Sequence, residues 1–248
     1  TDVTTSYNIT YVNDTTGAIN VRPITVTAVT NTKTYNATVS AVAIPTVSVN
    51  TIAGGDTENF IETYDTANVG TNKTLSPSGL VNDGNSGANY AVTFVNDNTG
   101  VISIKNINVT ANTGTKIYGD LEPVLAYAWD ALSGSDTFSG SLERAAGENV
   151  NTYAINQGTL SAGSNYAINF TGADFTITAK PITVTADAKS KTYAGSDPAL
   201  TYQITSGSLI GSDTLSGSLS RATGENYGVY LINQNTLIAS SNYNLIYI

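Results

Sequence analysis

Two pairs of opposite charges are the residues in this sequence best placed to do chemistry. Arg144 and Glu148 lie four residues apart around a glycine turn, and Arg221 and Glu225 repeat the arrangement further along the chain. Each pair could form a charged binding site, or it could be an ion pair that braces a turn. Because short-range opposite charges beside glycine usually fix a loop, we expect structural ion pairs.

Recurring tyrosines are the second candidate group. Exposed rings could present a surface for carbohydrate, whereas a buried ring with its hydroxyl bonded to the backbone is common in β-sandwiches. We expect core or corner tyrosines. The repeated positions are Tyr35, Tyr118 and Tyr193, then Tyr153 and Tyr230, then Tyr90, Tyr166 and Tyr243. Trp129, the single tryptophan, aligns with Ile204, which predicts a buried apolar position.

Several kinds of catalytic chemistry are excluded because the chain contains no histidine and no cysteine. A Ser-His-Asp triad, an imidazole base, a cysteine nucleophile and thiolate metal sites are therefore ruled out. Carboxylate pairs remain possible in principle, but only acidic residues at turns recur in all repeats. We expect no enzyme, no catalytic residues, no cofactor-binding residues and no cofactor.

Calcium is the metal that the remaining residue types could bind. Acidic and Asn-rich stretches occur at residues 82–85 and 130–136, but their spacing is not that of an EF-hand. We expect solvated loops and no metal site. A Lys-Asn crosslink made by the chain itself is a further alternative, since lysines recur in early strands and asparagines in late ones: Lys33, Lys116 and Lys191, with Asn89, Asn165 and Asn242. It would also need a buried acid, for which Glu148 and Glu225 are candidates.

The charge and apolar content of the chain exclude two partners. Ten basic residues face 19 acidic ones, for a net charge of −9, so binding to a phosphate backbone is not expected. No stretch approaches the roughly 20 apolar residues of a membrane helix, so we expect no membrane insertion by this segment.

Internal repetition is the strongest signal in the sequence. The 17 residues from Ser133 match those from Ile210 at 13 positions, at an offset of 77. Upstream, the stretches that begin at Ile24, Ile107 and Ile182 also match one another. The predicted organisation is 1–22, the closing strands of a preceding repeat; 23–105, repeat 1; 106–180, repeat 2; and 181–248, repeat 3.

The ends of the repeats carry a further expectation. Residues 18–21, 101–104 and 174–179 read as matching closing strands, and repeat 3 has no counterpart after Tyr243. We therefore expect repeat 3 to be truncated before its last strand, with an exposed sheet edge. No Gly/Ser linker separates the repeats, and Pro23 and Pro181 follow two of the junctions, which favours limited swivel.

Alternation of side chains predicts an all-β fold. Ile107, Val109 and Ala111 alternate with polar residues, as do Ile182, Val184 and Ala186. Gly- and Asn-rich stretches supply turns between short strands. Each repeat is therefore predicted as six to seven strands in a small Ig-like β-sandwich or a β-grasp-like sheet, with the domains arranged end to end as a rod.

The repeats resemble the MBG and YDG domains of bacterial surface adhesins. The resemblance rests on the ITVTA strand, Lys-x-Tyr-Gly/Ala at Lys116 and Lys191, Asp-Thr-x-Ser-Gly-x-Leu, and Arg-x-x-Gly-Glu-Asn. Repeats 2 and 3 look like the MBG type and repeat 1 like the YDG type, although Tyr35 is followed by Asn-Ala instead of Asp-Gly. The resemblance implies large, filamentous-haemagglutinin-like exported proteins and carries no catalytic residues.

The expected function follows from the repeats and the resemblance together. We expect a structural stalk or spacer of an extracellular bacterial adhesin or biofilm-matrix fibre, on the cell surface or secreted. The alternative is a module that itself binds glycan or matrix polysaccharide. The expected partners are the neighbouring repeats of the same chain, with like chains in a fibre or extracellular glycan as further candidates.

Overall fold

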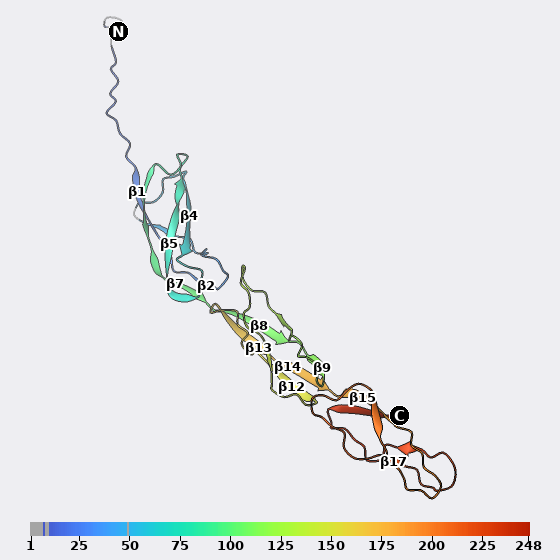
Figure 1. Cartoon of the computed structure of the whole chain (residues 1–248). Coiled ribbons are helices and arrows are strands. Elements are labelled where there is room, and N and C mark those ends of the chain that lie inside the picture. Colours follow the sequence, from blue (N-terminus) through green and yellow to red (C-terminus); the bar gives the residue numbers. More distant parts are fainter. Residues whose placement is uncertain (1–6, 8–9, 49) are drawn as a thin grey trace. The chain divides into compact units, whose positions relative to one another are not determined.

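The computed structural model describes residues 7, 10–48 and 50–248. The described part is built from β-strands and turns, as predicted, and it contains no helix long and apolar enough to cross a membrane. It divides into two compact units, Thr1–Lys105 and Asn106–Ile248. Figure 1 shows the strands of each unit.

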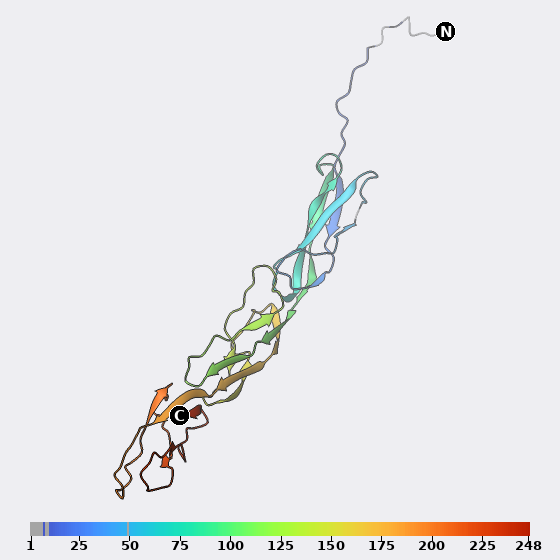
Figure 2. The same ribbon diagram turned by 90° about the vertical axis from the view of Figure 1, so that its right-hand side faces the viewer.

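Unit 1 contains repeat 1, which folds as two sheets. Its strands are β1 (Arg22–Thr27), β2 (Thr32–Thr34), β3 (Thr46–Ser48), β4 (Thr57–Tyr64), β5 (Gly70–Asn82), β6 (Tyr90–Val95) and β7 (Asp97–Ser103). One sheet has the order β3-β1-β6 and the other β2-β7-β5-β4. The long strands β4 and β5 lie side by side as an antiparallel pair (Figure 2).

The core of unit 1 lies between these two sheets. Ile24 and Val26 on β1 and Tyr90 on β6 meet Phe60 and Val81 from the other sheet. Alternation explains the pattern, since every second side chain of a strand faces the same layer. Fully burying one such side chain contributes about 1.5–3 kcal/mol.

Unit 2 contains repeats 2 and 3. The strands of repeat 2 are β8 (Lys105–Ala111), β9 (Gly114–Ile117), β10 (Tyr127–Trp129), β11 (Glu143–Arg144), β12 (Asn151–Asn156), β13 (Tyr166–Thr171) and β14 (Ala173–Thr178). They form one sheet of order β10-β8-β13 and a second of order β11-β12-β14-β9. Ile107 and Val109 face the core from β8, and Phe175 and Ile177 from β14.

Repeat 3 has fewer strands than repeat 2 among the described residues. They are β15 (Lys180–Ala186), β16 (Tyr202–Ser206), β17 (Ser220–Arg221), β18 (Ile232–Asn233) and β19 (Tyr243–Tyr247). The sheet β16-β15-β19 matches β10-β8-β13 of repeat 2, but the second sheet consists only of β17 and β18.

The N-terminal stretch differs from the closing strands predicted for residues 1–22. Residues 1–6 and 8–9 lie outside the described residues, and residues 10–21 form no strand. The physical reason is that a strand needs a partner: β1, from Arg22 onward, pairs with β3 and β6, whereas residues 10–21 pair with no strand in the described part of the chain.

Candidate functional site

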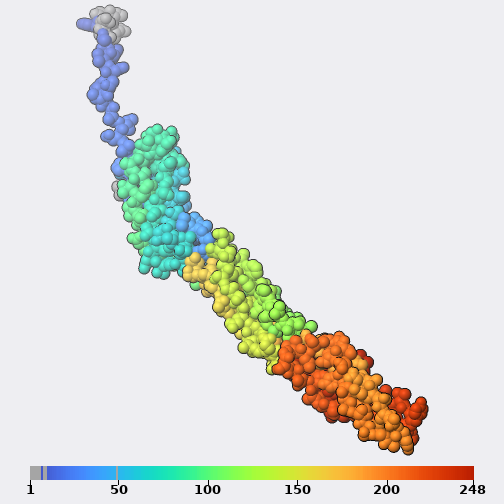
Figure 3. Space-filling model, viewed as in Figure 1, coloured from blue at the N-terminus to red at the C-terminus, as the bar shows by residue number. Residues whose placement is uncertain are grey.

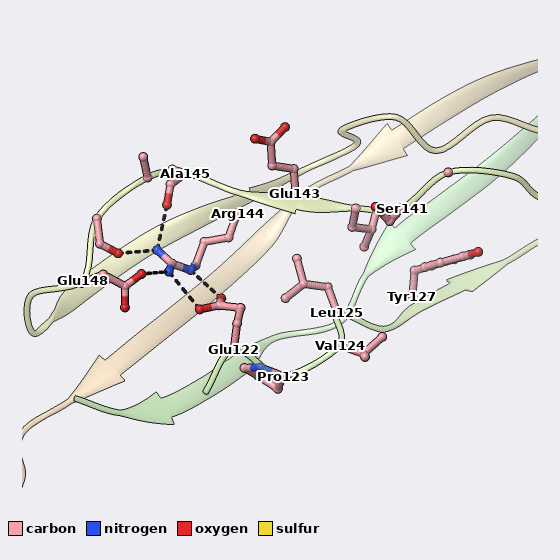
Figure 4. A pocket seen from close by; sticks show the side chains of 14 residues that line it. Glu122, Pro123, Val124, Leu125, Tyr127, Ser141, Glu143, Arg144, Ala145 and Glu148 are labelled. Carbon is pink, nitrogen blue, oxygen red and sulfur yellow. Dashed lines mark hydrogen bonds and ion pairs between the residues drawn. The ribbon is translucent and has the colours of Figure 1, made fainter. Parts of the chain in front are cut away.

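Arg144 is the centre of a charged cluster in repeat 2. Its Nε lies 2.7 Å from Glu122 Oε1, and its Nη2 lies 3.0 Å from Glu122 Oε2 and 2.7 Å from Glu148 Oε1. Glu122 thus accepts two bonds from one guanidinium, the geometry in which Arg–carboxylate pairs are strongest. Figure 4 shows the carboxylates of Glu122 and Glu148 directed at the guanidinium of Arg144, and all three residues line one pocket.

Lys116 on β9 completes this charged cluster, which we define as Lys116, Glu122, Arg144 and Glu148. Its Nζ lies 2.8 Å from Glu122 and 2.6 Å from Glu148, and its side chain is only 5% exposed. Arg144 Nη1 also donates to the carbonyl oxygens of Ala145 and Gly147. The cluster therefore joins β9, β11 and two loops.

The charges of the cluster stabilise one another. The hydrogen bond from Arg144 lowers the pKa of Glu122 to about 2, with a further contribution from Lys116. The bond from Lys116, followed by that from Arg144, lowers the pKa of Glu148. The bond from Glu122, followed by that from Glu148, raises the pKa of Lys116. The pKa values of these groups are shifted away from neutral pH, so the groups are poorly suited to proton transfer at that pH. We interpret the cluster as a brace for the two loops that carry Glu122 and Glu148.

Repeat 3 carries the same cluster with one difference. Lys191 and Arg221 bind Asp197 and Glu225, with the Arg221 Nη2 to Glu225 distance at 2.9 Å. Asp197 stands where repeat 2 has Glu122 and is one methylene shorter. It reaches Arg221 Nη2 at 3.2 Å, and Arg221 Nε is buried without a hydrogen-bond partner in the described structure.

Sequence reasoning found the Arg–Glu pairs, named Lys116 and Lys191 only as crosslink candidates and repeat markers, and missed Glu122 and Asp197. The usable signal was the shared spacing from the lysine to an acidic residue before proline, Lys116 to Glu122 and Lys191 to Asp197. The Nζ of Lys116 donates to Glu122 and Glu148 and not to an asparagine side chain. This geometry argues against a Lys-Asn bond in repeat 2.

A second constellation lies at the junction of repeats 2 and 3, inside unit 2. Tyr118 of repeat 2 donates its hydroxyl to Asp213 of repeat 3 at 2.9 Å. Its ring meets the ring of Tyr243 edge to face, with centroids 5.4 Å apart. Tyr243 donates to the same Asp213 carboxylate at 2.6 Å. One aspartate thus accepts hydrogen bonds from both repeats.

Further contacts extend this junction. Asn242 of repeat 3 accepts the backbone N–H of Val150 at 2.9 Å and donates to Asn149 at 3.0 Å. Gly119 has a positive φ of 80°, and a Cβ there would lie 2.5 Å from the side chain of Ile210. The chain crosses at Ala179, the single residue between β14 and β15. The two repeats are therefore held by side chains as well as by the backbone.

The late tyrosines share one arrangement. Tyr90, Tyr166 and Tyr243 are buried, and each hydroxyl accepts a backbone N–H and donates to an aspartate. Two half-buried tyrosines bond back to the chain four residues upstream, Tyr153 to the Asn149 carbonyl and Tyr230 to that of Asn226.

The early tyrosines differ from one another. Tyr35 is buried, Tyr118 is half-buried at the junction, and Tyr193 is 79% exposed. The prediction of a core or corner role is therefore wrong for Tyr193. In repeat 2 the backbone N–H of Tyr118 is bonded to Thr178 on β14, and repeat 3 has no strand in that place among the described residues.

The prediction of a buried Trp129 is also wrong, because this side chain is 56% exposed. Trp129 lies on β10, which is an edge strand of its sheet. Its ring packs against Tyr127 at 5.3 Å and Phe138 at 5.9 Å between centroids. The contact with Tyr127 and Phe138 replaces the core contact that its alignment with Ile204 had suggested.

The chain was compared with family models, curated proteins and solved structures. The model of the MBG domain (YGX type) matches residues 107–176 and 182–248, and the model of the YDG domain matches residues 20–100. The chain belongs to the MBG (YGX type) family. No curated protein and no solved structure matches it. MBG and YDG domains are typical of adhesin-like repeat proteins of the cell surface, and the resemblance read from the sequence is confirmed.

The geometry above can now be assigned within the MBG domains. Each MBG domain carries one charged cluster, and the contact between the two domains uses the Lys-x-Tyr-Gly element of the first. Among the described residues, no group of three or more acidic side chains is placed to hold a metal ion.

Proposed function

We propose that this chain is a non-catalytic stalk segment of an extracellular bacterial adhesin or biofilm-matrix fibre. Its repeats would hold a distal part of a longer protein away from the cell. The observation that carries the proposal is the junction of repeats 2 and 3, where Tyr118 and Tyr243 share Asp213 and a single residue links the two domains.

A spacer must resist bending at its joints, and the junction has the means to do so. A flexible linker lets domains swivel, whereas here hydrogen bonds, an edge-to-face ring contact and a close glycine approach oppose rotation. The charged clusters support the same role, because they hold loops beside the strands without any poised acid or base.

The experiment measures the stiffness of the joint. The chain has no cysteine, so spin labels can be placed at single cysteines introduced at exposed Ser164 in repeat 2 and Asn226 in repeat 3. Pulsed electron paramagnetic resonance should give one narrow distribution of distances between the two labels. Tyr118→Phe, which removes the bond to Asp213, should broaden it.

The matched control is Tyr247→Phe, which removes a hydroxyl bonded inside repeat 3 to the Ile232 carbonyl. It should leave the distribution unchanged. A distribution in the unsubstituted chain as broad as that of a Gly/Ser-linked pair would reject the stalk proposal.

A second candidate function is glycan binding, and an aromatic trio favours it: exposed Trp129 with half-buried Tyr127 and Phe138. Exposed aromatic faces beside polar groups are suited to the apolar faces of sugar rings. Repeat 3 has Tyr202, Ile204 and Leu215 at the equivalent positions, so the trio belongs to repeat 2 alone.

Trp129 is the single tryptophan, so its fluorescence reports directly on this surface. Saturable quenching of this fluorescence by a polysaccharide supports binding. Binding of the same polysaccharide on a glycan array should then be lost in Trp129→Ile. Ile is the residue that repeat 3 carries at this position, so the variant should fold. No response across the panel would leave the spacer as the sole function.

A further inference from the structure

The sandwich of repeat 2 is open along one side, where each of its two sheets has an edge strand. β10 is an edge of one sheet and β11 an edge of the other. A pocket of about 770 Å³ lies there, lined by residues 122–125, Tyr127 and residues 140–148. We call this pocket the cleft of repeat 2. Figure 4 shows Tyr127 at one end of the cleft and the charged side chains toward the other.

The register of β10 places two rings of the aromatic trio beside this opening. Trp129 lies opposite Val109, and Tyr127 lies opposite Ala111. Val109 and Ala111 are buried, and residues directly opposite in an antiparallel pair share one face of the sheet. Trp129 and Tyr127 are therefore on the core-facing side of β10, at an edge that no further strand covers in the described structure. Because Tyr127 belongs to both, the cleft and the trio adjoin.

The loop that borders the cleft carries apolar side chains that burial does not explain. Val124, which lines the cleft, is 98% exposed, and Leu121 on the same loop is 93% exposed. Repeat 3 forms the matching three-stranded sheet with smaller or polar residues at the equivalent positions. They are Ser196 for Leu121, Ala199 for Val124, Ile204 for Trp129 and Leu215 for Phe138. Apolar groups exposed together beside polar ones mark a binding surface, and here they distinguish repeat 2 from repeat 3.

The charged end of the cleft offers hydrogen-bond acceptors without an excess of positive charge. The charged cluster contains two carboxylates and two cations, which balance one another. Glu148 accepts one bond on Oε1 from Arg144 and one on Oε2 from Lys116, and its side chain is 64% exposed. A carboxylate has about four acceptor positions, so Glu148 can accept further O–H groups. The exposed Glu143 adds a negative charge to the lining, which disfavours an acidic ligand.

These features suit a sugar chain better than an extended peptide. A peptide that adds to a sheet needs a run of unpaired backbone groups along one edge. β10 has three residues and β11 two, and Pro123 in the loop between β9 and β10 has no N–H to donate. A sugar chain instead needs an aromatic face for its rings and acceptors for its hydroxyl groups. The cleft and the trio supply both, side by side.

We propose that the cleft of repeat 2 binds a segment of an uncharged polysaccharide. One sugar ring lies against Trp129, and the chain continues past Val124 to Glu148, whose carboxylate accepts hydrogen bonds from sugar hydroxyl groups. The proposal rests on the glycan-binding candidate and deepens it, because it names the class of glycan and gives the charged cluster a part in binding.

Repeat 3 provides an internal reference for this site. It carries the equivalent charged cluster but not the exposed apolar residues. Figure 3 shows repeat 2 in green to yellow and repeat 3 in orange to red as two bodies in contact. A substitution in the cluster of repeat 3 therefore matches one in repeat 2 without touching the cleft.

Titrations followed by Trp129 fluorescence test the class of ligand. The probes are dextran, galactomannan and β-glucan as uncharged chains, alginate as an acidic chain, and oligolysine as a basic peptide. At least one uncharged polysaccharide should bind, whereas alginate and oligolysine should not. Its affinity should change by less than about twofold between about 50 and 500 mM salt, because salt screens interactions between net charges.

Substitution of Glu148 tests the charged end of the cleft. Glu148→Gln should weaken binding of that polysaccharide about tenfold, because a carboxylate accepts hydrogen bonds more strongly than an amide. Glu225→Gln makes the same change in the cluster of repeat 3 and should leave binding unchanged. Equal effects of the two variants on binding would contradict a direct contact with Glu148.

Substitution of Val124 tests the middle of the cleft. Val124→Ala introduces the residue that repeat 3 carries at this position, so the variant should fold. It should weaken binding at least about threefold, because two methyl groups leave the contact. The control is Val42→Ala, the same change at an 88% exposed position of repeat 1, which should have no effect.

The results that would overturn the proposal are distinct from those that would reject glycan binding altogether. Binding of alginate or oligolysine alone would show that the class of ligand is wrong. An uncharged polysaccharide that needs Trp129 but tolerates both Glu148→Gln and Val124→Ala would confine the site to the trio. The glycan-binding candidate would then stand without the cleft. No response to any probe would exclude both the cleft and the glycan-binding candidate.

Discussion

At the scale of single residues, the two charged clusters show what one methylene does. Glu122 reaches both Nε and Nη2 of Arg144, whereas Asp197 reaches only Nη2 of Arg221. A buried donor without a partner loses its hydration and gains nothing in return. Repeat 3 thus carries a small, correctable defect.

Asp197→Glu should stabilise repeat 3, because the longer side chain can accept a hydrogen bond from Arg221 Nε. Urea unfolding followed by hydrogen exchange, which resolves repeat 3, measures the change. Glu122→Asp in repeat 2 is the mirror variant and should lose a similar amount. Changes of the same sign in both repeats would show that the arginine Nε bond is not the cause.

The sequence predicted this site in part. The Arg144–Glu148 spacing is local, and a short loop brings the two residues together whatever the remaining fold does. Glu122 and Lys116 join them only through the pairing of β9 with β14 and of β12 with β14, which spans distant parts of the chain. The exposure of Trp129 was not predicted for a similar reason. Alternation of side chains indicates the two faces of a strand but not whether the strand lies at the edge of its sheet.

At the scale of elements, β4 places an acid on the core-facing side of unit 1. Phe60, Glu62 and Tyr64 alternate on one face, and Glu62 is 1% exposed. Its Oε2 accepts the N–H of Val29, while Oε1 is buried with no hydrogen-bond partner among the described residues. Burial raises the pKa of Glu62.

This shift predicts a pH dependence for unit 1. The folded state holds the Glu62 proton more tightly than the unfolded chain, so the contribution of this group is fully present below the unfolded pKa and is lost as pH rises through the folded one. Glu62→Gln does not titrate and can still accept the Val29 bond. As the pH rises above the ordinary pKa of a glutamate, the variant should gain stability relative to the unsubstituted chain.

Denaturant unfolding at a series of pH values, read from unit 1 by hydrogen exchange, gives the difference. Asp65 and Asp83 have lowered pKa values and oppose this trend, but both are present in each protein and cancel. Glu58→Gln, at an exposed position of the same strand, is the control. A pH-independent difference for Glu62→Gln would rule out the burial effect.

Most of the strands themselves were readable, since alternation located β8 and β15 with their buried faces. The buried acid on β4 was not singled out, although Phe-Ile-Glu-Thr-Tyr places it on the same face as two aromatic residues. A pattern that scores apolar positions treats such an acid as a break and passes over it.

At the scale of the whole molecule, loops rich in Asp and Asn raise the question of bound calcium. In the described residues Asp83 accepts backbone N–H groups of its own loop, from Asn85, Gly87 and Asn89. Its oxygens are therefore engaged in shaping a turn. Among the described residues, no three acidic side chains lie together as potential ligands of a cation.

A chelator should accordingly leave the melting temperature of the full chain within about 2 °C, and millimolar calcium should not raise it. Scanning calorimetry with and without chelator makes the measurement, with magnesium as the control for ionic strength. A larger fall on chelation, reversed by calcium alone, would establish a bound cation.

The single residue between β14 and β15 also decides how repeat 2 responds to mechanical load. Tension arriving along the chain from β15 acts on the end of β14, which is bonded along its length to β9 on one side and β12 on the other. The load therefore shears both strand pairs, and many backbone hydrogen bonds must break at the same time. Peeling, in which bonds break one at a time, would need the load to act at right angles to the strand.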